Sequence, residues 1–377
     1  ESAGTVHEMG HSAAECQRII GELQEYMFTK TRLGIPALTC VEGIQGVLQN
    51  GATLFPHSIA QGSTFNPALI ERTDACGREA AAMGLHQILS PVLDIARELR
   101  WGRVEETFGE DPYLIAEMGI GFVKGYQKHR ISCMPKHFVA HGTPTGGLNC
   151  AQSGGERELR NLYLYPFARV IAETDPLAIM SCYSAFDGVP VSGSRYYMTD
   201  ILRGELGFRG FVYSDWGSVD RLKTFHYAVE TSADAARQSL IAGIDLNVDS
   251  AYQTLEEQVE AGKIDMEYID TAVRRMLYVK FALGIFDEPY GDAGEVKRVV
   301  RCADHVALAK EIADESAVLL ENNGILPLDL KKYKSIAVVG PNSDQTVYGD
   351  YSWVRPDTKE GVTLYQGLKN VLGDAVV

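Results

Sequence analysis

A carboxylate follows directly after an apolar run in the segment Gly210-Phe211-Val212-Tyr213-Ser214-Asp215-Trp216. Aromatic and β-branched residues in such a run are typical of a buried parallel strand, and an acid after it is typical of the mouth of a barrel. Trp216 adds a flat apolar ring beside the acid. We interpret Asp215 as a catalytic carboxylate, the alternative being a helix N-cap. Hydrolysis of a glycosidic bond uses such groups.

Lys136 and His137 follow a second apolar run that contains Cys133 and Met134. Two adjacent donors at the end of a strand can hold neighbouring hydroxyl groups of a sugar. A different barrel enzyme would use Lys136 as the Schiff-base lysine of an aldolase. The loop that begins at His141 is rich in Gly and Pro, and we expect it at the rim of the pocket.

Three further polar residues stand at strand ends or close to them. Glu42 ends the first apolar run, and Tyr183 ends the run that contains Met180. A phenol can hold a carboxylate by a hydrogen bond, although a packed core tyrosine fits the pattern as well. Arg103 offers a planar fork of donors. Nearby charged residues fit a site or a buried ion network equally well: Asp94, Arg100, Glu105 and Glu106.

Strand-like and helix-like segments alternate along most of the chain. Strands are expected at residues 35–41, 88–95, 131–139, 177–183, 210–216 and 241–248. Helices are expected at residues 14–29, 68–83, 111–126, 156–172, 232–242 and 264–286. This alternation predicts parallel βα units and an α/β fold with a (β/α)8 TIM-like barrel. A doubly wound sheet is the alternative, but polar ends on at least four strands favour a closed ring around one pocket.

A second pattern begins after the break at residues 287–292. We expect a (β/α)8 catalytic barrel at residues 1–290 and a linker with a leading helix at residues 291–334, the helix being at 303–321. Residues 335–377 would form the N-terminal part of an α/β sandwich domain, with its first strand at 335–339. Only about half of such a domain fits there, so we expect the remainder of the sandwich to follow or to belong to another chain.

Composition excludes several classes of partner. The chain has 377 residues and a formal net charge of -15, which argues against nucleic acid and anionic membranes. No apolar run reaches the length of a transmembrane helix. Seven scattered cysteines form no Cys-x-x-Cys pair, so no metal site is expected, and Cys40, Cys133 and Cys182 are expected to be small buried apolar residues.

Several of these segments together resemble glycoside hydrolase family 3. The resemblance spans nearly the whole chain. The matching segments are Gly51-Ala52-Thr53-Leu54-Phe55-Pro56, Arg100-Trp101-Gly102-Arg103, Glu105-Glu106-Thr107-Phe108-Gly109-Glu110-Asp111-Pro112, Lys136-His137-Phe138 and Ser214-Asp215-Trp216.

This resemblance implies a barrel followed by an α/β sandwich, and a retaining exo-β-glycosidase with Asp215 as nucleophile. The terminal sugar would be bound by Glu42, Arg103, Lys136, His137, Met180, Tyr183 and Trp216. The substrate would be a β-linked glucoside or oligosaccharide, and no metal or organic cofactor is implied. In two-domain members the general acid lies in the sandwich domain, and we expect it beyond Val377.

Two features bear on the choice of sugar. Glucosidases of this family often have Asp at the position of Glu42, and the longer side chain leaves room for a xylose preference. The segment Gly146-Gly147-Leu148-Asn149 resembles β-glucosidases and favours glucose. The Asp-x-His loop of members that act on N-acetylglucosamine is missing from residues 142–149, which disfavours that activity.

Three broader properties stay open at this level. The competing class of protein is a barrel that binds carbohydrate without turnover. No signal peptide is visible at Glu1-Ser2-Ala3-Gly4, yet one could have been removed, so we favour a periplasmic or secreted location over a cytoplasmic one. A homo-oligomer is compatible with the sequence.

Overall fold

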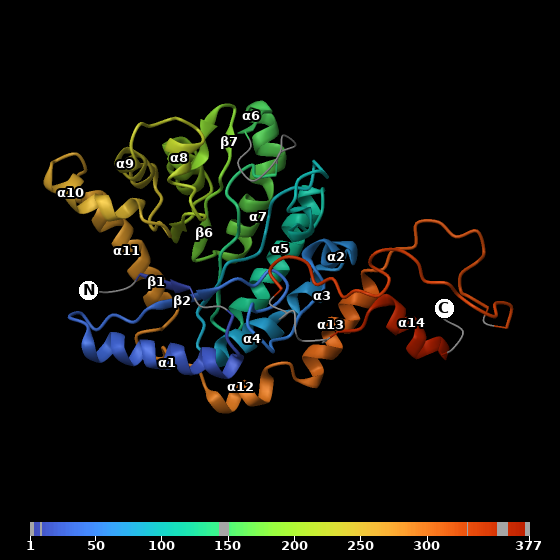
Figure 1. Ribbon diagram of the computed structural model, residues 1–377. Coiled ribbons are helices and arrows are strands. Elements are labelled where there is room, and N and C mark those ends of the chain that lie inside the picture. The colour runs from blue at the N-terminus through green and yellow to red at the C-terminus, as the bar shows by residue number, and fades with distance from the viewer. Residues whose placement is uncertain (1–3, 8–9, 143–150, 330, 353–360, 374–377) are drawn as a thin grey trace.

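The computed structural model describes residues 4–7, 10–142, 151–329, 331–352 and 361–373. Short strands lie near its centre (Figure 1), and their parallel pairings arrange them as a ring. The ring strands are β1 (Thr5–His7), β2 (Leu38–Val41), β3 (Gln87–Ile88), β4 (Ser132–Cys133), β6 (Ala178–Met180) and β9 (Phe211–Tyr213). They occur in this order in space, and all the pairings between them are parallel.

Isolated bridges join the two groups of strands into one ring. Phe138 pairs with Ser181, which links the β4 segment to β6, and Tyr213 pairs with Leu246. Leu246 in turn lies against the start of β1, because a Cβ on Gly4 would be 3.2 Å from its Cδ1 atom. The predicted barrel-like α/β fold is therefore confirmed. Within the described residues the ring has seven positions, six strands and Leu246, where the sequence suggested eight strands.

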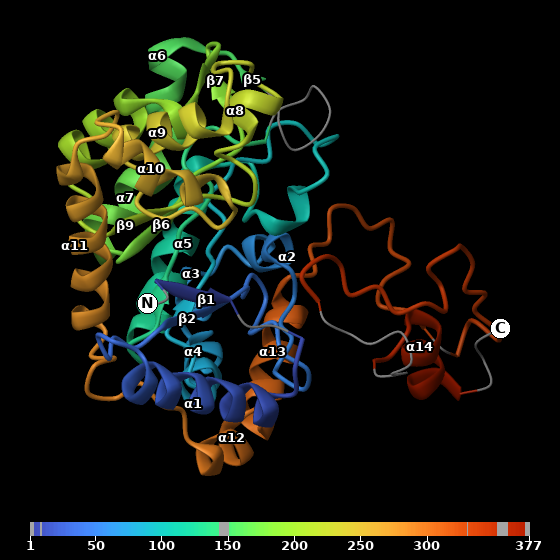
Figure 2. The ribbon, with the colours of Figure 1, turned by 60° about the vertical axis from the view of Figure 1, so that its left-hand side comes forward.

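Helices surround the ring, and further helices follow the barrel (Figure 2). They are α1 (Ala13–Lys30), α2 (Ser58–Ser63), α3 (Pro67–Glu71), α4 (Asp74–Met83), α5 (Pro112–Gln127), α6 (Gly155–Glu158), α7 (Leu164–Thr174), α8 (Arg221–Thr224), α9 (Ser232–Ala242), α10 (Leu255–Glu260), α11 (Met266–Ala282), α12 (Ala293–Val299), α13 (Ala303–Glu315) and α14 (Leu364–Leu372). Wider π-helical turns occur at Leu159–Tyr163 and Tyr196–Glu205, and 3-10 turns at Val104–Glu106, Val191–Gly193 and Ala251–Thr254. A small side sheet contains β5 (Ala151–Gln152), β7 (Ala185–Phe186) and β8 (Val189–Pro190).

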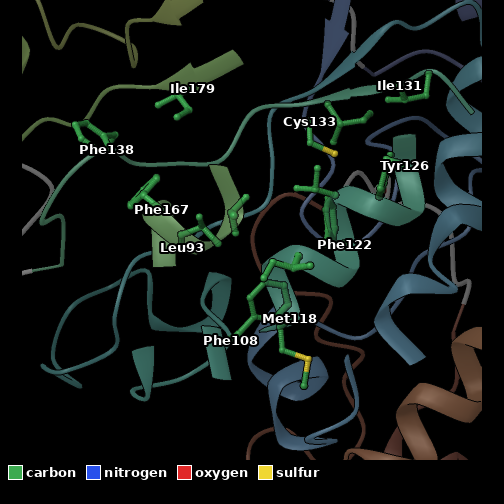
Figure 3. Packing of buried hydrophobic residues seen from close by; sticks show 14 of the residues in the cluster. Leu93, Phe108, Met118, Phe122, Tyr126, Ile131, Cys133, Phe138, Phe167 and Ile179 are labelled. Atoms are coloured by element: carbon green, nitrogen blue, oxygen red, sulfur yellow. The ribbon is translucent and has the colours of Figure 1, made fainter. Parts of the chain in front are cut away.

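The ring strands separate two apolar cores, because successive side chains of a strand point to opposite faces. Val41, Ile88 and Val212 belong to the core between the ring and its helices. In Figure 3 the side chains of α5 meet those of β4 and its neighbours in this core. The residues that alternate with these along the strands, such as Cys40 and Tyr213, form a second core, which we place inside the ring. Each strand is thus buried on both faces and can expose polar groups only at its ends.

Several predicted element bounds were wrong for local reasons. The run at 88–95 is a strand only at Gln87–Ile88, and Pro91, which lacks a backbone donor, follows. The run at 241–248 does not begin with a strand, since α9 continues to Ala242. Gly243 ends the helix at a φ of 119°, which favours glycine. Only Leu246 then reaches the ring.

Helices were also divided or shortened. The expected helix at 68–83 is divided into α3 and α4 around Arg72 and Thr73. The helix expected at 156–172 comprises α6, a π-helical turn and α7, and the helix expected at 264–286 is α11, Met266–Ala282.

The segment after the barrel departs most from expectation. The helix expected at 303–321 ends at Glu315, and the strand expected at 335–339 has only an isolated bridge at Ile336. Apolar side chains such as Leu320 and Val339 are exposed there, so nothing in the described chain packs against them. Figures 1 and 2 both show α14 standing away from the barrel. A strand needs a neighbour for its backbone groups, and the described residues form no ladder with this segment beyond the bridge at Ile336.

Cys40, Cys133 and Cys182 are buried, as predicted. No described helix combines the length and the apolar character needed to cross a bilayer.

Candidate active site

The polar residues predicted from strand ends gather at the carboxyl end of the ring. Glu42 follows β2, Lys136 and His137 follow β4, and Asp215 follows β9. Because the strands are parallel, their carboxyl ends open to the same side of the barrel. These four side chains are almost entirely buried, with Asp215 only 4% exposed.

Asp215 is held through one carboxylate oxygen. The Tyr183 phenol and the backbone N–H of Trp216 both donate to its Oδ1 atom, each at 2.7 Å. The Oδ2 atom is buried and accepts no hydrogen bond. Burial raises the pKa of Asp215, and the charge of Arg103 and the Tyr183 hydrogen bond limit the rise. The carboxyl group is thus fixed in place with one free oxygen.

His137 lies beside this free oxygen but does not neutralise it. Its Nδ1 atom is 2.6 Å from Asp94 Oδ2, and its Nε2 atom is 3.5 Å from Asp215 Oδ2. Burial and then the charge of Arg103 lower the pKa of His137 well below its ordinary value, so the ring is neutral. With its Nδ1 proton donated to Asp94, its Nε2 atom is an acceptor that receives a hydrogen bond from Arg103 at 3.2 Å.

Arg103 forms a bidentate pair with Glu106. Its Nε and Nη2 atoms donate to the two Glu106 carboxylate oxygens at 2.6 and 2.7 Å. The short turn Val104–Glu106 brings the two side chains together three residues apart. Desolvation opposes the charge of the guanidinium, but the Glu106 hydrogen bonds prevail and raise the pKa of Arg103. The buried ion network considered from the sequence is therefore present around Asp94 and Glu106. Arg100 does not belong to it, since its side chain is exposed and pairs with Glu98.

Lys136 forms a second buried pair, with Glu42. Its Nζ atom donates to Glu42 Oε2 at 2.8 Å, and Lys136 is only 1% exposed. Burial disfavours the ammonium, but the Glu42 carboxylate more than offsets burial and raises the pKa of Lys136. A Schiff-base lysine needs the opposite shift, because its neutral amine is the nucleophile. This pairing argues against the aldolase reading.

The remaining predicted site residues differ in their surroundings. Trp216 is 45% exposed beside Asp215, so its ring is available to a ligand. Met180 lies in the apolar core inside the ring, and its contact with a sugar remains a prediction. His141 is buried and packs edge-on against His137 at 5.0 Å, so it is no rim residue. The rest of the predicted loop, at 143–150, lies outside the described residues.

Two further residues near this site were missed in the sequence analysis. Tyr351 lies 5.2 Å below the Lys136 ammonium, measured to the ring centroid. Its segment is anchored on the barrel, since Gln45 Nε2 donates to the Asp350 carbonyl at 2.7 Å. His7, the last residue of β1, lies 5.7 Å from the Trp216 ring. Tyr351 is more than 200 residues from Lys136 in the chain, so no local pattern links them, whereas the strand-end position of His7 was a usable signal.

The geometry separates Asp215 from the other acids of the pocket. Glu42, Glu106 and Asp94 each have a basic or imidazole partner within 2.8 Å. Among these four acids, and within the described residues, only Asp215 has a fully buried carboxylate oxygen that accepts no hydrogen bond. A fixed carboxylate with one oxygen free of hydrogen bonds, a neutral imidazole beside it and paired cations around it can act as a nucleophile on a polyhydroxylated substrate.

Comparisons with known proteins identify the family of the chain. Residues 6–279 match the profile described as "Glycosyl hydrolase family 3 N terminal domain", and residues 317–375 match "Glycosyl hydrolase family 3 C-terminal domain". A β-xylosidase of Formosa agariphila is 35% identical over 95% of this chain and 54% of its own length. A periplasmic β-glucosidase of Salmonella typhimurium is 33% identical over 94% of this chain and 48% of its own length.

The fold comparison gives the same result. The solved structure of a β-glucosidase from Erythrobacter marinus has a TM-score of 0.93 and 32% identity, over 100% of this chain and 52% of that one. The chain thus spans about half the length of the relatives that it matches. From the two family profiles, the shared fold and the relatives above 30% identity, we conclude that the chain belongs to glycoside hydrolase family 3.

Proposed function

We propose that the protein is a retaining exo-β-glycosidase that releases a terminal β-D-glucose, with Asp215 as its nucleophile. The observation that carries the proposal is the unpartnered Asp215 Oδ2 atom in a pocket whose other acids are paired. The names of the relatives, β-glucosidase and β-xylosidase, support the same class of substrate.

In the proposed reaction, Asp215 Oδ2 attacks the anomeric carbon and the glycosidic oxygen leaves with a proton from a general acid. A glycosyl ester of Asp215 forms, and water then attacks the same carbon and restores the carboxylate. In retaining enzymes the two carboxyl groups lie about 5–5.5 Å apart. We assign the general acid to none of the described residues, since Glu42, Glu106 and Asp94 each have a partner.

Substrate binding in this proposal falls to the groups around Asp215. Lys136 and Arg103 donate to hydroxyl groups, Glu42 accepts from them, and Trp216 provides an apolar face. The neutral His137 ring borders the Asp215 oxygen that forms the ester.

Covalent labelling tests the proposal against a binding protein without turnover. The intact protein is incubated with a 2-fluoro β-glucoside that has an activated aryl leaving group, which needs little help from a general acid. We expect mass spectrometry to find one sugar attached to Asp215. A peptide that contains Asp215 but has no added mass, together with intact binding of glucose, would instead support the carbohydrate-binding alternative.

Glu42 gives β-xyloside hydrolysis a specific basis as the second candidate. Its side chain pairs with Lys136 at the carboxyl end of the ring, and two of the matched relatives are named β-xylosidase or putative β-xylosidase. One methylene in a pocket changes discrimination by about 10-fold or more. We expect Glu42→Asp to raise the ratio of kcat/KM for aryl glucoside over aryl xyloside by about 10-fold.

Taking a ratio of two substrates cancels losses that are common to both, such as a weaker Lys136 pair. The exposed Glu22, paired with Arg18, provides Glu22→Asp as the matched control. If Glu42→Asp and the control give the same ratio, Glu42 does not select between glucose and xylose.

In the pH profile of kcat/KM, the midpoint of the acid limb should lie above the ordinary pKa of an aspartate. Asp215 must be ionised to attack, and burial raises its pKa above the ordinary value, so activity is lost as the pH falls through this raised pKa. Tyr183→Phe removes a hydrogen bond that favours the carboxylate, so the acid limb should move to higher pH and kcat should fall about tenfold. Tyr196→Phe serves as control, because the Tyr196 phenol donates to Glu156 and not to Asp215. If the acid limb of Tyr183→Phe does not move, this limb does not report the ionisation of Asp215.

The broader predictions remain proposals. A periplasmic or secreted location is supported by one relative named periplasmic, and a homo-oligomer is left as an expectation. The division into a barrel at 1–290, a linker at 291–334 and a sandwich part at 335–377 also remains a prediction. We propose the remainder of this sandwich as the structural partner of the exposed apolar residues after Glu315, such as Leu320 and Val339.

A further inference from the structure

Arg221, the first residue of α8, contacts two residues of the pocket at once. Its Nη1 atom donates to the Trp216 backbone carbonyl at 2.9 Å. Its guanidinium carbon lies 4.0 Å from the centroid of the Tyr183 ring, which is a close cation–π contact. Arg221 thus ties Trp216 to Tyr183.

The two residues that Arg221 connects are the same two that hold Asp215. The Tyr183 phenol and the Trp216 N–H both donate a hydrogen bond to Asp215 Oδ1 at 2.7 Å. The contacts therefore form a closed loop in which Asp215 and Arg221 occupy opposite sides. The backbone of Tyr183 is held as well, since His226 Nε2 lies 2.8 Å from its carbonyl oxygen. The position of the free Asp215 oxygen depends on every member of this loop.

We infer that Arg221 is a positioning residue for the nucleophile, acting through Tyr183 and Trp216 and not by contact with the sugar. The inference rests on the proposed function, in which Asp215 Oδ2 attacks the anomeric carbon. With Oδ1 held by two donors, the carboxylate plane and the Oδ2 lone pairs are held in one orientation. Loss of alignment by a fraction of an ångström at a reacting atom costs rate without removing any reacting group.

The chemistry of the side chain explains why arginine stands at this position. A planar guanidinium can lie flat on a phenol ring while an N–H at its edge donates to a carbonyl. A lysine ammonium is a compact charge that can satisfy one of the two contacts but has no plane to stack. Arg221→Lys should therefore keep the charge and lose part of the positioning, and Arg221→Met should lose both contacts.

The test measures how fast Asp215 is labelled by the 2-fluoro β-glucoside in the intact protein. For Arg221→Met we expect a limiting rate of labelling about tenfold lower, with the half-saturating concentration changed by less than about threefold. The acid limb of labelling should move to higher pH, because a misplaced Tyr183 phenol favours the carboxylate less. Arg221→Lys should lie between Arg221→Met and the unchanged protein. Arg195→Met is the control, since Arg195 is exposed and pairs with Asp200 at 3.7 Å.

The outcomes separate this inference from the proposed function. The final extent of labelling counts the folded sites, so a lower extent at a normal rate would mean lost protein and would overturn the positioning role. A normal rate and an unmoved acid limb in both Arg221 variants would overturn it too, with the proposed function intact. If the unchanged protein itself acquires no label on Asp215, the proposed function fails, and this inference fails with it.

Discussion

Asp215→Asn should abolish turnover of an aryl β-glucoside, lowering kcat by about 10⁴-fold, while the protein keeps its fold. The amide oxygen can still accept the hydrogen bonds of Tyr183 and Trp216, so the local structure is retained. The side chain loses the anionic oxygen that forms the glycosyl ester. Steady-state kinetics with an activated leaving group measures the effect, because formation of the glycosyl ester, which kcat/KM reports, then needs little help from the general acid.

The raised pKa of Asp215 also determines the sign of the expected change in Tm for the same variant. An acid whose folded-state pKa is raised contributes stability below its unfolded pKa, and this contribution is lost as the pH rises through the folded-state pKa. The ionised group therefore destabilises the fold at pH 7, and neutral Asn does not. We expect the Tm of Asp215→Asn to equal or exceed that of the unchanged protein at pH 7, with the gap closing below about pH 4.

Asp94→Asn provides a comparison with a second buried acid. Asp94 accepts from the His137 ring and backbone, so its substitution disturbs an orienting contact but leaves the nucleophile in place. A smaller loss of kcat is expected there than at Asp215. Near-normal turnover of Asp215→Asn, with the fold kept, would exclude Asp215 as the nucleophile and with it the proposed mechanism.

The barrel could be predicted from the sequence because its strands are buried on both faces. Such strands are continuous apolar runs that end in polar residues, as in the run before Asp215. The strand lengths could not be predicted, because a run stays apolar past the point where its backbone leaves the ladder. Pro91 and the helix end at Gly243 mark two such points. The strand expected at 335–339 shows the same limit, since β pairing depends on a neighbour that the local sequence does not contain.

The site could be predicted as a set of residues but not as a set of pairs. Glu42, Lys136 and Asp215 were each visible as polar groups at strand ends. The partner of each depends on which strands become neighbours, so the sequence left the Lys136–Glu42 pair and the free Asp215 oxygen open. Arg221 and Tyr351 were missed because their importance comes from contacts with residues far along the chain.

Lys136→Met should lower the free energy of unfolding by about 3–5 kcal/mol, because it leaves the Glu42 carboxylate buried without its cation. Glu42→Gln should be destabilising for the same reason, since it leaves a buried ammonium without its anion. The double variant Glu42→Gln with Lys136→Met contains neither charge, and replacement of a whole buried pair is often close to neutral. Denaturant unfolding of the four proteins should therefore give a strongly non-additive cycle.

Activity in the same four proteins separates a structural pair from one that binds sugar. If Lys136 and Glu42 only stabilise the fold, the double variant should recover turnover together with stability. If they donate to and accept from substrate hydroxyl groups, the double variant should regain stability and remain at least about 100-fold below the unchanged protein in kcat/KM. We expect the second outcome. The pair lies at the carboxyl end of the ring with Asp215, where the proposed substrate binds. An apolar pair would serve equally well if stability were its only role.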